Sequence, residues 1–187
     1  MNSLFEAGLE IQNFLNSKKW PFCFIGGLAV IRWGEVRMTQ DIDLCVLSGF
    51  GSEKKYIDGL LGSFRSRISG AKEFAITNRV LLLTASNEVP LDLTLSGLPF
   101  EKQMINHATP FSYMPDCSLL SCSAEDLIVL KAFADRAQDR IDVKGIIARQ
   151  EGQLDIEYIF KHLKPLSELK ESPEILDNLH NILKQKV

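Results

Sequence analysis

The segment FIGGLAVIRWGEVRMTQDIDLCV, residues 24–46, carries the strongest structural signal in this chain. It joins a Gly-Gly pair after an apolar run to Asp41 and Asp43, which lie on either side of one isoleucine in a second apolar run. Successive side chains of a strand point to opposite faces, so both carboxylates would project from the same face. Two such groups repel each other and are costly to desolvate, and a divalent cation between them would remove both penalties. The segment therefore predicts a magnesium-type site beside a backbone turn suited to phosphate.

A third carboxylate, Asp92, lies in the segment PLDLTL, residues 90–95, on the opposite face from its leucines. If this segment pairs beside residues 41–47, Asp92 would complete a site for two Mg²⁺ ions, which take oxygen ligands and keep places open for phosphate oxygens. The alternatives are a solvated acidic pair on an edge strand and a solvent-facing Asp92 on a half-exposed strand. The apolar residues around Asp41 and Asp43 favour a buried strand, and therefore the metal site.

The glycine pair and the residues before Asp41 suggest where phosphate would bind. Gly26 and Gly27 follow an apolar strand and open a helix, so backbone N–H groups and a helix N-terminus would favour an anion. Arg37 and Thr39 would add a guanidinium fork and a hydroxyl donor. The alternatives are a tight turn without a ligand and two ordinary surface residues.

Further charged residues follow in the second half of the chain. Lys131 stands on or beside the apolar stripe of its predicted helix, so it either extends to the surface or points into a cleft. A dense charged cluster comes next, and such clusters are usually solvated helix faces or pairs one turn apart. Its members are Arg136, Asp139, Arg140 and Asp142.

The sequence pattern divides the chain of 187 residues into an α+β lobe, residues 1–115, and a helical lobe, residues 121–187, which share one cleft. A first helix is predicted over residues 3–17, and a hairpin is predicted from strands at 74–76 and 80–84. Ser123 resembles the first residue of a capping box. The third helix of the second lobe is predicted to stop near Pro165.

Composition excludes several classes of protein. The hydrophobic fraction of 45% and charged fraction of 24% are ordinary for a soluble protein, and the net charge of −3 weakens the case for tight non-specific nucleic-acid binding without excluding a local basic groove. No apolar stretch is long enough for a transmembrane helix, and the N-terminus does not have the pattern of a signal peptide. The four cysteines lack CxxC spacing. We therefore expect a cytoplasmic chain without a membrane partner.

The acidic and glycine motifs together resemble the nucleotidyltransferase superfamily of DNA polymerase β. The pattern of that superfamily is a hydrophobic residue with Gly-Gly or Gly-Ser, a short helix, Asp-hydrophobic-Asp and a later acidic strand residue. The RxTxDID form, with Arg37 and Thr39, is closest to the AbiEii-like toxin nucleotidyltransferases of bacterial type IV toxin–antitoxin systems. The segment SAEDLIVLKAFADRAQDRIDV, residues 123–143, is similar to the later motifs of that branch, a lysine on a helix followed by Arg-x-x-Asp-x-x-Asp. The positions that match these later motifs are Lys131, Arg136, Asp139 and Asp142.

The resemblance covers roughly residues 22–47, 88–95 and 121–146, and the chain is shorter than the large AbiEii toxins. It implies an α+β, polymerase-β-like fold: a small mixed sheet flanked by helices, with a helical C-terminal lobe that closes over the nucleotide. Asp41 and Asp43 would hold the metals, and Asp92 would complete the second site and help to activate an acceptor hydroxyl. Gly26, Gly27 and Lys131 would hold the triphosphate. Asp139 or Asp142 would orient Lys131 or the acceptor.

The function that the resemblance implies is Mg²⁺-dependent transfer of NMP from an NTP to a hydroxyl of RNA, tRNA or protein, with release of pyrophosphate. In a toxin–antitoxin pair, the partner would be a cognate antitoxin or regulator. Two alternatives stay open: a non-catalytic antitoxin or pseudoenzyme that keeps the fold, and a nucleotidyltransferase that modifies a small molecule such as an antibiotic.

Overall fold

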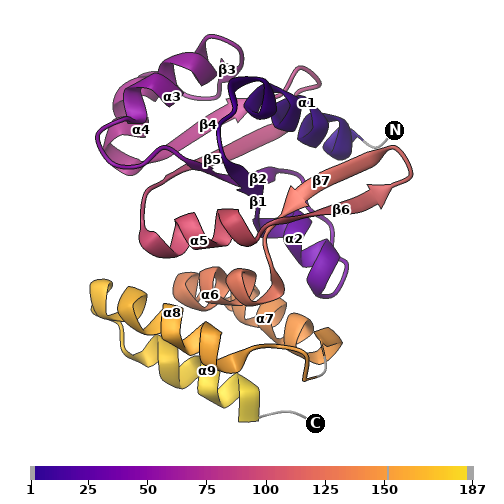
Figure 1. Cartoon of the computed structure of the whole chain (residues 1–187), viewed down its shortest axis with the longest axis vertical. Helices are drawn as coiled ribbons and strands as arrows, with labels where there is room; N and C mark the ends of the chain where they lie inside the picture. The colour runs from indigo at the N-terminus through magenta and orange to yellow at the C-terminus, as the bar shows by residue number, and fades with distance from the viewer. Residues whose placement is uncertain (1–2, 151, 185–187) are drawn as a thin grey trace. The chain divides into compact units, whose positions relative to one another are not determined.

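The computed structural model describes residues 3–150 and 152–184 (Figure 1). Within these residues the chain forms two compact units. One contains the residues up to Leu28 together with Met38–Cys122, and the other contains Ala29–Arg37 together with the residues from Ser123 onward. The division falls inside helix α2 (Gly26–Trp33), so this helix begins in the first unit and ends in the second.

The first unit is built on a seven-stranded mixed sheet with the strand order β3-β4-β5-β2-β1-β7-β6. The two central strands, β2 and β5, run parallel, whereas β4 pairs with β5 and β1 pairs with β2 in the antiparallel sense. The predicted pairing of residues 41–47 beside residues 90–95 is confirmed. The strands are β1 (Phe22–Phe24), β2 (Ile42–Leu47), β3 (Arg65–Ser66), β4 (Val80–Thr84), β5 (Pro90–Ser96), β6 (Thr109–Met114) and β7 (Cys117–Ser121).

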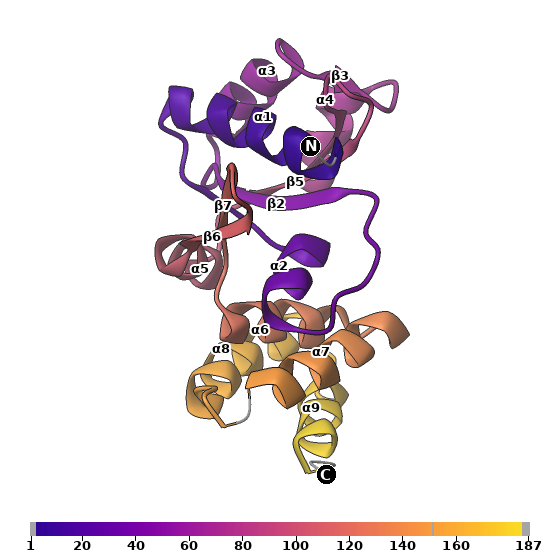
Figure 2. The ribbon, with the colours of Figure 1, turned by 90° about the vertical axis from the view of Figure 1, so that its right-hand side faces the viewer.

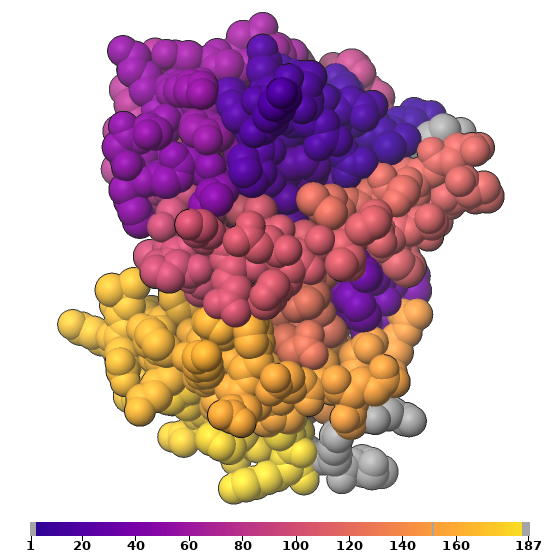
Figure 3. Space-filling view, viewed as in Figure 1, coloured from indigo at the N-terminus to yellow at the C-terminus, as the bar shows by residue number. Residues whose placement is uncertain are grey.

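Helices lie on both faces of this sheet (Figure 2). On one face lie α1 (Ser3–Lys18), α3 (Glu53–Leu61) and α4 (Ala71–Asn78), and on the other lies α5 (Pro99–His107). Helix α1 buries a stripe of apolar residues at helical spacing (Leu4, Ala7, Ile11 and Leu15), which is why its sequence is recognisable as a helix. The hairpin β6–β7 projects at the edge of this unit (Figure 3).

The predicted hairpin of residues 74–76 and 80–84 is wrong. Residues 71–78 form helix α4, which ends where Arg79 adopts a left-handed backbone with φ of 56°. The apolar side chains of Phe74 and Ile76, in the segment assigned to the first strand, are exposed, at 37% and 55%. The strand that pairs with β4 is instead the two-residue β3. Of the three residues assigned to the first predicted strand, Ala75 is the buried one, so the large apolar side chains of the segment do not mark its buried face.

The second unit contains further helices besides the end of α2. Its helices are α6 (Ala124–Ala134), α7 (Ala137–Gln150), α8 (Ile156–Leu169) and α9 (Glu174–Lys184). Ser123 caps α6 as predicted, because its hydroxyl accepts a hydrogen bond from the backbone N–H of Asp126 at 3.1 Å. Helix α8 continues past Pro165 to Leu169, so the predicted stop at this proline is wrong. Proline removes only one N–H donor, and the buried Leu163 and Leu166 hold the helix on both sides of it.

The observed architecture confirms the α+β class that the sequence predicted, with a mixed sheet flanked by helices. The four cysteines are free and buried, as the absence of paired spacing suggested. Among the described residues, no helix combines the length and the apolar character that crossing a membrane requires.

Candidate functional site

The three predicted carboxylates converge in the first unit. Asp43 on β2 lies directly opposite Asp92 on β5 in the parallel register, and Asp41 comes just before β2. One oxygen from each of Asp41, Asp43 and Asp92 lies within 4.8 Å of the other two, and all three residues are half-buried. The alternative of solvated carboxylates at a sheet edge does not apply to β2 and β5, since both are interior strands.

The glycine pair packs directly against this acidic triad (Asp41, Asp43 and Asp92). Gly26 has a φ of 56°, and a Cβ atom at this position would lie 1.9 Å from Oδ2 of Asp43. A Cβ atom on Gly27 would lie 2.3 Å from the hydroxyl oxygen of Thr39. That hydroxyl donates a hydrogen bond to Oδ1 of Asp41 at 2.9 Å. The sequence therefore needs glycine at both positions, because the turn occupies the space beside both carboxylates of the Asp-Ile-Asp motif.

These side chains fit a divalent cation. Carboxylate oxygens are the ligands that Mg²⁺ prefers, at metal–oxygen distances of about 2.1 Å, so two ligands of one ion lie at most about 4.2 Å apart. The oxygens of the triad, within 4.8 Å of one another, need only small side-chain rotations to reach that spacing. Each carboxylate offers hard, anionic oxygen ligands. A bound cation would reduce the electrostatic repulsion among the three carboxylates.

Arg67 also contacts the triad, and the sequence analysis did not identify it. It follows the short strand β3, and its guanidinium forms an ion pair with Oδ1 of Asp92. The pKa of Asp92 lies above its ordinary value, chiefly because of burial and also because of the negative charge of Asp41. The Arg67 guanidinium lowers this pKa but does not outweigh the other effects. No motif marks Arg67, since its contact with Asp92 depends on how β3, β4 and β5 pair.

A second cluster of predicted residues lies within the second unit and is centred on Lys131. The ammonium group of Lys131 contacts Oδ1 of Asp139 at 2.9 Å and Oδ2 of Asp142 at 2.8 Å. Arg136 donates to Asp139 at 2.6 Å, and Arg37 forms two hydrogen bonds to Asp142 at 3.0 and 3.1 Å. We call these five residues the lysine network. Three cations and two carboxylates give the network a formal charge of +1.

The lysine network is buried at its centre, so the usual interpretation of such a cluster as a solvated helix face is wrong here. Lys131, Asp139 and Asp142 are 8%, 1% and 4% exposed. Burial raises the pKa of Asp139, but hydrogen bonds from Arg136 and Lys131 outweigh this effect. Burial also raises the pKa of Asp142, and hydrogen bonds from Arg37, Lys131 and Gln138 outweigh it there. The pKa of each carboxyl therefore lies below its ordinary value, and both carboxylates stay charged beside Lys131.

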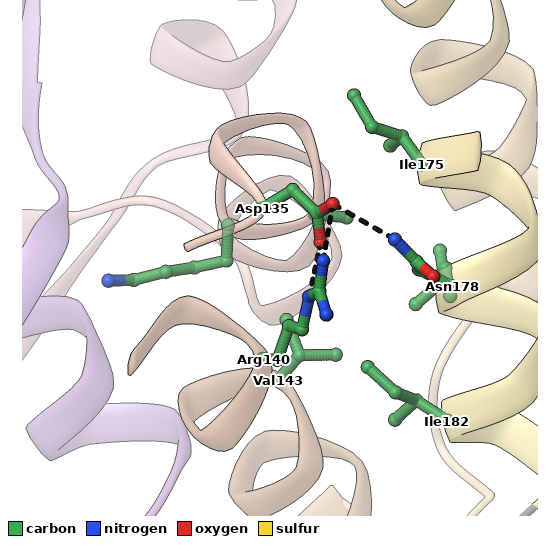
Figure 4. Close-up of a pocket in the computed structure, with 9 residues that line it drawn as sticks. Asp135, Arg140, Val143, Ile175, Asn178 and Ile182 are labelled. Carbon is green, nitrogen blue, oxygen red and sulfur yellow. Dashed lines mark hydrogen bonds and ion pairs between the residues drawn. The ribbon is translucent and has the colours of Figure 1, made fainter. Parts of the chain in front are cut away.

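A neighbouring ion pair joins the end of α6 to side chains of α7 and α9 (Figure 4). Arg140 on α7 donates to both oxygens of Asp135, at 2.7 and 2.9 Å, and Asn178 on α9 donates to Oδ2 of the same carboxylate at 2.9 Å. Asp135 is the residue at which α6 ends, with a left-handed φ of 55°. Its pKa is lowered chiefly by the hydrogen bond from Arg140. This cluster connects α6, α7 and α9, and we assign it a structural role.

The structure thus places the predicted residues in two groups, each within its own unit. Gly26, Gly27 and Thr39 accompany the acidic triad. Arg37, which the sequence analysis grouped with Thr39 at phosphate, binds Asp142 in the lysine network. The sequence left open which of Asp139 and Asp142 would orient Lys131. In the structure both carboxylates contact its ammonium group.

Comparison with solved structures relates this fold to known proteins. The chain is similar to the antibiotic-resistance factor ANT(2'')-Ia, with 15% identity, a TM-score of 0.54 and coverage of 95% of this chain and 96% of that one. The structure of the same protein in complex with adenylyl-2''-tobramycin matches with 16% identity, a TM-score of 0.54 and coverage of 89% and 98%. The chain has the nucleotidyltransferase fold.

Two further structures agree with this fold. The lincosamide antibiotic adenylyltransferase LnuA, bound to lincomycin, matches with 14% identity and a TM-score of 0.51, over 75% of this chain and 94% of that one. An antigenic nucleotidyltransferase-like protein from Paracoccidioides brasiliensis matches with 16% identity and a TM-score of 0.51, over 93% and 90%. No protein-family model matches the sequence, and neither does any curated protein. At these identities the likeness concerns the fold.

Proposed function

We propose that the protein is a nucleotidyltransferase that uses divalent cations, Mg²⁺ in the first instance, to transfer NMP from an NTP to an acceptor hydroxyl, with release of pyrophosphate. One observation carries this proposal: the carboxylates of Asp41, Asp43 and Asp92 converge within 4.8 Å beside the glycine turn. The nucleotidyltransferase fold supports it, because the same fold occurs in the lincosamide antibiotic adenylyltransferase LnuA, which matches 75% of this chain.

Each residue of the first unit then has a chemical task. Asp41 and Asp43 would hold the cations, and Asp92 would complete the ligand set and accept the proton of the acceptor hydroxyl. The bound cations would stabilise the charge on the attacking and leaving oxygens. The N–H groups at the start of α2 would face phosphate oxygens, for which Gly26 and Gly27 leave room. Thr39 orients Asp41 through its hydrogen bond of 2.9 Å.

The proposal keeps the role that the resemblance gives to Lys131, a contact to the triphosphate. Asp139 and Asp142 hold the ammonium group from two sides, so its position is fixed before any ligand binds. Arg37 would act here through Asp142 rather than as a direct phosphate contact.

We propose two classes of acceptor for the transferred nucleotide. A small hydroxyl-bearing antibiotic is the class to test first, because the solved neighbours over nearly the whole chain include a complex with adenylyl-2''-tobramycin. The AbiEii-like motifs favour a second class, RNA, tRNA or protein, as for a toxin with a cognate antitoxin. The two classes are separated by supplying each with the same labelled nucleotide.

The direct test is a transfer assay with α-labelled NTPs and Mg²⁺. One series would contain tobramycin, lincomycin and related compounds, and another would contain total RNA, tRNA or a protein extract. Label on a small molecule would support antibiotic modification, and label on RNA or protein would support the toxin-like activity. A thermal-shift titration is run in parallel, since a ligand that binds the native state raises its melting temperature. An absence of label on every acceptor, without a Mg²⁺-dependent NTP shift, would support the non-catalytic interaction protein.

Substitution of the acidic pair tests the catalytic assignment. Asp41→Asn and Asp43→Asn each remove a charged cation ligand, and we expect transfer to fall at least about 10²-fold, since metal stabilisation contributes several kcal/mol. Circular dichroism and urea unfolding should show an intact fold, because each change removes a negative charge from a crowded site. Full activity in both variants would refute the assigned role.

A further inference from the structure

The row of residues that crosses the sheet at the triad ends in a positive charge. Asp43 on β2 lies opposite Asp92 on β5, and Asp92 lies opposite Leu82 on β4. The backbone N–H of Arg67, just after β3, donates to the carbonyl of Leu82 at 2.9 Å. Residues in such a row share one face of the sheet, so Arg67 reaches across Leu82 to the carboxylate of Asp92.

The backbone on both sides of Arg67 is fixed. The hydroxyl of Ser66 donates to the carbonyl of Ile68 at 2.8 Å and accepts from the N–H of Ile68 at 3.1 Å. The hydrogen bond from Arg67 to Leu82 ties the same turn to β4. The backbone from which the Arg67 side chain extends to Asp92 is therefore held in place, and the side chains of Arg67 and Asp92 are 32% and 34% exposed. The ion pair with Asp92 is thus made by a side chain whose backbone is fixed by hydrogen bonds.

We propose that Arg67 is a positioning residue that acts as an internal counter-ion for Asp92. It orients the third carboxylate of the triad and weakens the attraction of the triad for a free divalent cation. Three carboxylates give the triad a charge of −3, and the guanidinium brings the group to −2. This inference rests on the proposed metal-dependent function, and it adds a residue that sets how readily the site takes its cation and how well Asp92 is aligned.

Two opposite effects distinguish this role from a structural one. Removing the positive charge should strengthen cation binding, because a like charge no longer repels the ion. Removing the hydrogen bond should slow transfer, because Asp92 is no longer held in one orientation. A merely structural contact would not make the cation bind more tightly.

The experiment measures Mn²⁺ binding by electron paramagnetic resonance at low ionic strength, without nucleotide, and NMP transfer on the same preparations. We expect Arg67→Gln to bind Mn²⁺ about threefold or more tightly than the unmodified protein, with kcat lowered about tenfold or more. Arg67→Lys, which keeps the charge, should return the Mn²⁺ affinity to its original value. Arg65→Gln is the matched control, since Arg65 lies two residues before Arg67, in β3, but pairs with Glu88, and these two side chains are 66% and 74% exposed.

An unchanged or weaker Mn²⁺ affinity in Arg67→Gln, or an equal gain in Arg65→Gln, would overturn the inference. Its failure is distinguishable from failure of the proposed function. Transfer by the unmodified protein, without any difference in Mn²⁺ binding between the variants, would refute the role of Arg67 alone. Tighter Mn²⁺ binding in Arg67→Gln, without transfer by any form of the protein, would refute the proposed activity and retain the counter-ion.

Discussion

Gly26 and Gly27 have different reasons to be glycine. At Gly26 both the left-handed backbone, with φ of 56°, and the nearby Asp43 carboxylate exclude a side chain. At Gly27 only space is limiting, because Thr39 lies where a Cβ atom would be. Both glycines thereby connect the start of α2 to the Asp-Ile-Asp motif. Removing either one would disturb an acidic side chain, directly at Gly26 and through Thr39 at Gly27.

The first prediction concerns Gly26→Ala. The new methyl group would displace the Asp43 carboxylate as well as strain the backbone, so we expect a loss of more than about 2 kcal/mol of unfolding free energy and weaker Mn²⁺ binding. Gly49→Ala is the control, since Gly49 also has a positive φ, 69°, but a Cβ atom there would meet no atom within 4 Å. It should cost about 1 kcal/mol and leave Mn²⁺ binding unchanged. Equal effects of the two substitutions in urea unfolding and Mn²⁺ titration would contradict this interpretation.

At the scale of elements, α6 and α7 are joined by a buried charge network rather than by apolar residues alone. Lys131 on α6 contacts Asp139 and Asp142, which lie on one face of α7 at a spacing of nearly one turn. A buried ion pair is weak support for stability in itself, but removal of one partner leaves the other charges unpaired. The lysine network therefore couples the stability of this helix pair to the residue that we assign to the triphosphate.

Lys131→Met should lower the free energy of unfolding by about 1.5–3 kcal/mol, because Asp139 and Asp142 would lose a charged hydrogen-bond donor while each keeps an arginine partner. The exposed Lys144 on α7 provides the control, and Lys144→Met should change stability by less than about 0.5 kcal/mol. Urea unfolding measures both. A stable Lys131→Met variant that has lost NTP binding would mean that Lys131 serves the ligand and not the helix pair.

At the scale of the whole molecule, the carboxylates with lowered pKa values predict sensitivity to acid. Asp135, Asp139 and Asp142 all have pKa values below the ordinary range in the folded chain. An unfolded aspartate has a pKa of about 3.9, so the unfolded chain binds protons first as the pH falls. Their contribution to stability is present above the unfolded pKa and is lost as the pH falls through the folded values.

We therefore expect the free energy of unfolding to decrease steadily below about pH 5. Asp135→Asn removes one of these groups while its partner Arg140 is half exposed, at 49%, so the variant should fold and show a shallower decrease. Urea unfolding at successive pH values from about 6 to 2.5 gives both slopes. Parallel curves for the variant and the unmodified protein would exclude a contribution from Asp135.

Local sequence patterns were sufficient for the acidic triad and its glycine turn. The alternation in residues 41–47 and 90–95 assigns each carboxylate to a strand face, and a strand–glycine–helix order is a local property of the chain. The family resemblance added the fold class and the chemistry. Patterns failed at α4, where the apolar Phe74 and Ile76 are exposed on a helix and do not belong to a strand. They also failed at Pro165, where packing of neighbouring leucines maintains the helix.

The sequence by itself predicted the fold class and marked the three carboxylates and Lys131 as candidate site residues, because each of these residues belongs to a motif within a short stretch of chain. Only the tertiary structure decided that Arg67 pairs with Asp92, that Arg37 binds Asp142 and that both Asp139 and Asp142 hold Lys131. These contacts depend on strand register and helix packing between distant segments, which follow from the whole core and not from local periodicity. The charged side chains that surround each predicted residue are therefore known only from the tertiary structure.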